Sequence, residues 1–458
     1  MIAQRKKEGW VYVAVGLCSA AVFVLMLTAR KAQAVPSFAR QTGLACSSCH
    51  TNPPELTPLG RTFKLNGYTM AGLKVITSPP EKQKAGLSLL SVLPLSAWFE
   101  TSNTGTNKPQ PGTQNWSFSF PQDVSLFLAG AYATHLGGFV QATYNVQKDH
   151  FSWDNTDIRY SNNRLVKGKT LVYGVDLNNN PTVEDLWNST PAWGFPWVNS
   201  PSAPTPAASA VVDGRLAQDV AGLGGYAMWN DHLYGAATVY RSSHLGQTLP
   251  NAGTNFQFNI QGAAPYWRAA WQQTMGNSYL ELGTYGFHMR STPQAITGPE
   301  DIYTDNAVDA QFEHVLPKWR NNLIALHGTY IHENSKLNAE VAATPPGASF
   351  VLHHLNTYRI NAAYHFGYRY APAFEYFTTT GTSDPLLFAP AAITGSANGS
   401  PNSKGYILNL TYWPVQNIRM AAQYTGYTQF NGAGRNYDGL GRNAGDNNTV
   451  YLYLGLIF

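Results

Sequence analysis

Cysteine is nearly absent from this chain, which has three cysteines in 458 residues. Cys18 lies within an N-terminal apolar run, so only Cys46 and Cys49 remain in the rest of the chain. Two cysteines so close together cannot build a framework of several disulfides. A small extracellular domain stabilised by disulfides is therefore excluded.

Charged residues are also scarce, at 12% of the chain. Residues 1–34 contain five basic residues and one acidic residue. Removing these from the 30 basic and 26 acidic residues of the whole chain leaves 25 of each sign. The formal net charge of +4 thus belongs to the N-terminal segment. A balanced remainder indicates no nucleic-acid partner and no acidic partner.

Residues 1–34 have the pattern of a secretory signal peptide. Basic residues at positions 5–7 precede the apolar run, and the segment ends in a small-x-small triplet at positions 32–34. A retained membrane anchor is the alternative, but the apolar run is short for a spanning helix. We expect this segment to be removed on export, together with Cys18.

The two remaining cysteines belong to a C-x-x-C-H sequence that ends at His50. In an exported protein this pattern is typical of c-type haem attachment, with two thioethers to the haem and the adjacent imidazole as proximal iron ligand. A zinc site would need further His or Cys ligands, which residues 35–85 lack, and a thioredoxin-like dithiol would need a βαβ pattern. We predict one covalent haem c per chain, held by Cys46, Cys49 and His50.

The sixth iron ligand is left open by the sequence. Met70 lies twenty residues after His50 and is the soft ligand of the N-terminal segment. A methionine opposite a histidine raises the reduction potential of haem, but most methionines are ordinary apolar residues. A histidine from elsewhere, or an open or water-bound position, is the alternative to Met70.

A polar linker at residues 77–86 separates the haem segment, residues 35–76, from residues 87–458. Beyond it, apolar and polar residues alternate with the two-residue period of strands. Sixteen candidate strands are joined alternately by short turns and long connections, as in bacterial outer-membrane barrels. These strands begin near residues 90, 122, 137, 152, 168, 218, 231, 264, 278, 304, 320, 354, 368, 404, 416 and 447.

The alternation predicts which side chains face the membrane and which face the lumen. The terminal strand places Val450, Leu452, Leu454, Leu456 and Phe458 on one face, as the last strand of an outer-membrane barrel does. The closing strand of a soluble β-domain is the alternative. The predicted lumen-facing residues are Asp309, Gln311, Glu313, Ala325, His327, Arg359, Asn361, His365, Arg369 and Glu375. Of these, His327 and His365 are candidate ligands or stacking partners of a haem inside the barrel.

We therefore predict an all-β fold. It is a sixteen-stranded antiparallel outer-membrane β-barrel (porin-like), and its short N-terminal cytochrome c segment, largely helical or irregular, plugs the lumen. The stretch 35–69 around the haem motif, followed by such a barrel, resembles the fused outer-membrane monohaem cytochrome c–porin family of iron-oxidising bacteria. The resemblance implies an Fe(II):cytochrome c oxidoreductase with haem on Cys46, Cys49 and His50, and it assigns no catalytic residue.

The same resemblance implies that the partners are extracellular Fe(II) or another small reductant, and a periplasmic electron carrier such as a c-type cytochrome or a blue copper protein. A single haem must connect the two sides of an apolar band of about 25 Å, so we expect the haem inside the barrel. The barrel itself is surrounded by outer-membrane lipid. The segment should enter from the periplasmic side, with connections 178–216, 333–353, 381–402 and 429–446 outside. The connection 178–216 has few acidic residues, which predicts no separate non-haem iron site. The alternatives are a diffusion porin with a periplasmic haem docking or sensing module, and a haem peroxidase.

Overall fold

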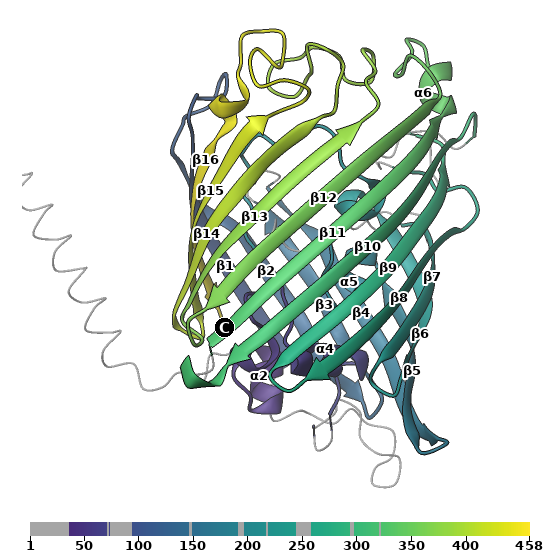
Figure 1. Cartoon of the computed structure of the whole chain (residues 1–458), viewed down its shortest axis with the longest axis vertical. Helices are drawn as coiled ribbons and strands as arrows, with labels where there is room; N and C mark the ends of the chain where they lie inside the picture. Colours follow the sequence, from purple (N-terminus) through teal and green to yellow (C-terminus); the bar gives the residue numbers. More distant parts are fainter. Residues whose placement is uncertain are drawn as a thin grey trace, which may run out of the picture. The chain divides into compact units, whose positions relative to one another are not determined.

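Sixteen strands pair in chain order and close into one antiparallel barrel (Figure 1). Closure joins β1 to β16, from Trp98 opposite Ile457 to Thr106 opposite Thr449. The computed structural model describes residues 36–70, 73, 94–145, 149–190, 197–216, 219–243, 258–293, 297–319 and 322–458. Residues 36–458 form one unit. The predicted signal peptide and the predicted linker lie outside the described residues.

The elements have the following bounds. The strands are β1 (Leu95–Thr106), β2 (Ser117–Ala133), β3 (Leu136–Asn145), β4 (His150–Val166), β5 (Lys169–Asn178), β6 (Val220–Trp229), β7 (Leu233–Ser242), β8 (Ala264–Met275), β9 (Ser278–Ser291), β10 (Asp301–Leu316), β11 (Asn322–Leu337), β12 (Leu352–His365), β13 (Tyr370–Gly381), β14 (Ser403–Val415), β15 (Ile418–Gln429) and β16 (Thr449–Ile457). The helices are α2 (Ser37–Thr42), α3 (Cys46–Cys49), α4 (Pro58–Leu65), α5 (Pro181–Glu184) and α6 (Asn338–Ala342), with short helical turns η1 (Val211–Arg215), η2 (Pro317–Trp319) and η3 (Ala444–Asn447).

The predicted strand number and the predicted alternation of short and long connections are confirmed. Every strand begins within five residues of its predicted start. Even-numbered strands connect to the next strand through short turns, including the two-residue β4–β5 turn at residues 167–168. The other end carries the longer connections, as in membrane-spanning barrels.

The two faces of the strands follow the predicted alternation. In β16, Tyr451 and Tyr453 are buried inside, whereas Leu452 on the other face is 45% exposed. Of the predicted lumen residues, Asp309, Gln311, Glu313, Ala325, His365 and Glu375 are buried. The prediction for Arg369 is wrong, because β13 begins only at Tyr370 and Arg369 lies exposed in the preceding turn.

The β5–β6 connection folds into the lumen, so the prediction that residues 178–216 face outside is wrong. Its side chains Val183, Trp197 and Val211 are 0–1% exposed. The main-chain N–H of Val211 donates to Glu333 Oε2 on the barrel wall at 2.7 Å. The connection carries its own apolar residues, and burying them inside the barrel removes them from water. Among the described residues, no helix is long and apolar enough to cross a membrane.

Candidate functional site

The C-x-x-C-H sequence forms one short helical turn, α3, followed by His50 in extended conformation. The imidazole Nδ1 lies 3.2 Å from the main-chain carbonyl oxygen of Glu55. A carbonyl accepts only, so Nδ1 carries the proton and donates it there. Nε2 is then left as the ligating nitrogen, which is how second-shell hydrogen bonds orient metal-binding histidines.

Helix α4 holds the haem motif from the side. Thr57 caps this helix by accepting a hydrogen bond from the Gly60 N–H at 3.1 Å. The Thr57 hydroxyl donates to the Ser48 carbonyl at 2.6 Å, and its N–H donates to the Cys49 carbonyl at 3.0 Å. A Cβ on Gly60 would lie 2.1 Å from the Cys49 carbonyl oxygen, so only glycine permits this approach.

The donor set fits a c-type haem. Cys46 and Cys49 are free thiols one turn apart, and burial raises the pKa of both. Burial lowers the pKa of His50 to about 4, so its imidazole is neutral, the form that binds iron. Within the described residues, no group of three or more His, Cys, Asp or Glu side chains could hold another metal ion.

The candidate sixth ligands remain predictions. Met70 follows α4 and is 39% exposed. His365 is buried, and its Nε2 has no hydrogen-bond partner among the described residues. His327 Nε2 lies 4.0 Å from Glu55 Oε1. Glu55 is also the residue whose main-chain carbonyl accepts the hydrogen bond from His50.

Buried ion pairs tie the haem segment to the barrel wall. Arg61 Nη1 lies 2.7 Å from Glu313 Oε1 of β10, with both side chains 5% exposed. The Arg61 guanidinium also lies over the ring of Tyr279, 4.2 Å from its centre. Breaking one partner of a pair this deeply buried leaves an uncompensated charge and is costly. The pair therefore fixes α4 against the wall formed by β9 and β10.

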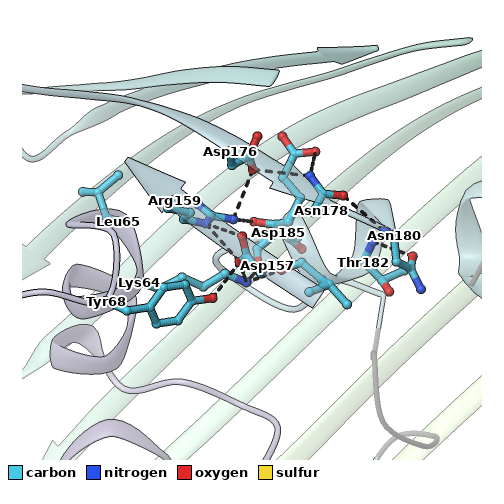
Figure 2. A network of polar contacts seen from close by, with 12 residues as sticks. Lys64, Leu65, Tyr68, Asp157, Arg159, Asp176, Asn178, Asn180, Thr182 and Asp185 are labelled. Carbon is cyan, nitrogen blue, oxygen red and sulfur yellow. Dashed lines mark hydrogen bonds and ion pairs between the residues drawn. The ribbon is translucent and has the colours of Figure 1, made fainter. Parts of the chain in front are cut away.

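A second buried network joins the haem segment to β4 and to the β5–β6 connection (Figure 2). Lys64 Nζ donates to the carbonyl of Asp185 at 2.9 Å and to that of Val183. The Tyr68 hydroxyl donates to Asp157 Oδ2 at 2.6 Å, and Arg159 Nε lies 2.9 Å from the same oxygen. Burial, with repulsion from Arg159, lowers the pKa of Lys64 to about 8.

The β5–β6 connection also contacts the residues that follow the C-x-x-C-H sequence. Trp197 is fully buried and donates from Nε1 to Glu55 Oε1 at 3.1 Å. Arg419 of β15 donates from Nη2 to the Trp197 carbonyl at 2.7 Å and to Asn52 Oδ1 at 3.4 Å. The wall, the connection and the haem motif thus form one hydrogen-bonded structure.

Sequence reasoning predicted haem binding by Cys46, Cys49 and His50, which stays a prediction, and it missed the residues that surround them. Thr57-Pro58 is a helix start signal, with a capping threonine followed by proline in the first turn, and it could have located α4. No local pattern indicates that Trp197 meets Glu55, because the two residues are 142 positions apart.

Comparisons with known proteins give the fold alone. No protein-family model matches the chain, and no curated protein matches it. Among solved structures, the chain is similar to OmpF of Salmonella typhi in complex with daunomycin (12% identity, TM-score 0.47, covering 80% of this chain and 97% of that one). It is also similar to the anion-selective porin of Comamonas acidovorans (11%, 0.45, 80% and 98%) and to the outer membrane channel DcaP of Acinetobacter baumannii (8%, 0.45, 80% and 96%). These neighbours are outer-membrane porins and channels.

Proposed function

We propose that this protein is an outer-membrane electron conduit, which takes electrons from an extracellular reductant, most plausibly Fe(II), and passes them to a periplasmic carrier. One observation carries the proposal. The C-x-x-C-H residues lie at the short-turn end of a closed barrel, where Cys46 Sγ is 3.9 Å from the Gln416 carbonyl, with His50 Nδ1 bonded to Glu55 and Nε2 left for iron. A haem held there would lie at one end of the lumen.

The chain's own residues bind and orient the cofactor. Cys46 and Cys49 would hold it covalently, and His50 would be its proximal ligand. When bound, a c-type haem supplies reversible one-electron exchange. Glu55 fixes the plane and tautomer of His50 through its carbonyl, and Thr57 and Gly60 fix the distance between α3 and α4. None of these residues needs to move during electron transfer.

Contact with a short turn supports a position at the periplasmic end of the lumen. The apolar band of an outer-membrane barrel is about 25 Å tall. Electron tunnelling falls steeply with distance, so one cofactor serves both sides only from within that band. Cys46 Sγ lies 3.9 Å from the Gln416 carbonyl in the short β14–β15 turn. In barrels of this class the short turns are periplasmic, so we place the haem segment at the periplasmic end of the lumen.

A diffusion porin with a haem docking or sensing module is the second candidate, favoured by the porin-like barrel. Two segments occupy this lumen, residues 36–70 and the β5–β6 connection, and both are tied to the wall by buried ion pairs. One such pair is Arg61–Glu313, and another joins Arg268 Nε to Asp185 Oδ1 at 3.2 Å. This filling favours a conduit, which needs no solute path.

Two measurements test the proposal. Stopped-flow reduction of the purified oxidised protein by Fe(II) should be fast, and slower with organic donors of similar potential. Swelling assays in liposomes should show low permeability to small sugars. Rapid sugar permeation without reduction of the haem by Fe(II) would favour the porin. An open sixth position in the ferrous absorption spectrum, with peroxide turnover, would favour a haem peroxidase.

A further inference from the structure

A polar cavity of about 310 Å³ lies in the lumen, and Trp197 and Arg419 stand between it and the N-terminal segment. Its lining includes Trp197 and Arg419, the two residues that connect the wall to Glu55 and Asn52. On the opposite side it is lined by strands β1 to β4. The cavity therefore begins beyond the two side chains that bond Glu55 and Asn52.

Three carboxylates line this cavity, Glu100 of β1, Asp123 of β2 and Asp154 of β4. Among the described lining residues, Arg419 is the single basic residue, so the cavity carries an excess of negative charge. Arg419 contacts two other lining residues, because its guanidinium bonds the Trp197 carbonyl and lies 5.7 Å from the ring centre of Tyr453, so it offsets one of the three carboxylate charges.

Glu100 and Asp123 are register partners, directly opposite each other on neighbouring strands. Like charges in this position destabilise a strand pair. Among the described residues, no basic side chain forms an ion pair with either of them. Glu100 accepts from the Tyr453 hydroxyl at 2.6 Å, and Asp123 accepts from the Asn145 side-chain amide at 2.8 Å. These neutral donors do not cancel the repulsion between two carboxylates, whereas a cation in the cavity would.

Two irregularities in strand pairing lie beside polar residues that line this cavity. Between β3 and β4 the pairing passes from Val140–Thr156 to Ala142–Trp153, so that Asp154 and Asn155 both stand opposite Gln141. The Asn155 side chain is 1% exposed and lines the cavity, and its Oδ1 has no hydrogen-bond partner among the described residues. A second irregularity lies between β1 and β2, beside Glu100. Irregularities of this kind re-aim side chains and are common beside functional sites.

We propose that this cavity binds a hydrated divalent cation, and this inference rests on the proposed function for its identification as Fe²⁺. The carboxylates supply the charge, and Asn155 Oδ1 accepts a hydrogen bond from a water of the ion. Six waters occupy roughly 180 Å³ as liquid, so an aquo ion fits the cavity. The ion keeps its waters, since the described residues contain no cluster that could hold a bare metal ion.

Binding of Mn²⁺ to the holoprotein in detergent tests this site, because Mn²⁺ is a divalent aquo ion whose free form is counted by electron paramagnetic resonance. We expect one weak site per chain. The variant Glu100→Gln/Asp123→Asn should bind at least about tenfold more weakly. The matched control Asp231→Asn/Glu300→Gln removes the same charges far from the cavity and should bind as the native chain does. Haem staining and unheated gel mobility confirm that each variant is folded.

Two results would overturn the site. One is an absence of Mn²⁺ binding by the native chain, and the other is an equal loss of binding in both double variants. Failure of the proposed function has a different outcome. In that case Mn²⁺ binds as expected while Fe(II) does not reduce the haem. If only the cation site is wrong, Fe(II) reduces the haem and the Glu100→Gln/Asp123→Asn variant has the same dependence on Fe(II) concentration as the control.

Discussion

The imidazole Nδ1 of His50 and the main-chain carbonyl of Glu55 are joined by a hydrogen bond of 3.2 Å. The carboxylate of the same Glu55 accepts from Trp197 at 3.1 Å, so one residue links the predicted iron ligand to the connection that fills the lumen. The orientation of the ligand therefore depends on the whole interior of the barrel.

Replacing both thiols tests covalent attachment. The variant Cys46→Ala/Cys49→Ala should lose all haem staining on a denaturing gel, because the one other cysteine of the sequence, Cys18, lies in the predicted signal peptide. The control Ser47→Ala/Ser48→Ala keeps both thiols and should stain as the native chain does. Staining that survives the loss of both cysteines would end the haem c assignment.

Substitution of Gly60 tests the contact between α3 and α4. In Gly60→Ala the new Cβ would lie 2.1 Å from the Cys49 carbonyl oxygen, so the helices must separate. We expect the haem content per chain to fall severalfold while the barrel still folds. Gly235→Ala in β7 is the control, since nothing lies within 4 Å of its Cβ position. Equal haem content in the two variants would show that this contact is dispensable.

Trp197 tests whether the β5–β6 connection keeps the lumen closed. Its truncation to Ala removes a fully buried side chain and should destabilise the connection by about 3–5 kcal/mol. Single-channel conductance in planar bilayers should then rise. The control Trp319→Ala removes a side chain that is 66% exposed and should leave conductance unchanged. A native chain that already conducts as a wide pore would contradict the plugged lumen.

The positions of the strands could be predicted because each has one face toward apolar lipid and one toward a polar interior, so buried and more exposed residues alternate through much of β15 and β16. The sequence predicts the haem ligands from a fixed spacing that c-type attachment chemistry requires, and this assignment stays a prediction. The prediction that residues 178–216 face outside was wrong, because a long polar connection with scattered apolar residues has the same sequence pattern whether it lies outside or inside a barrel. Sequence reasoning also missed Lys64 and Arg61, whose partners Asp157 and Glu313 are distant in the chain.

Lys64 should make stability depend on pH. Its pKa in the folded chain is about 8, below the ordinary 10.5, so between these values the unfolded chain binds more protons than the native chain. The native chain should therefore gain stability relative to Lys64→Met as pH rises from 8 to 10.5, by up to about 3 kcal/mol. Urea unfolding at pH 7.5 and 10 measures this gain, with the exposed Lys318→Met as control. Identical pH slopes for the native chain and Lys64→Met would refute the assignment.

Electron transfer across a sealed bilayer tests the central claim most directly. Proteoliposomes would enclose ferric cytochrome c in one preparation and the Fe(II) chelator ferrozine in another, with Fe(II) added outside to both. A conduit predicts that the enclosed cytochrome is reduced while the enclosed ferrozine stays colourless, and that Cys46→Ala/Cys49→Ala abolishes the reduction. Coloured ferrozine at the rate of cytochrome reduction, or reduction that persists without the two cysteines, would show that Fe(II) passes through the barrel and would contradict the account.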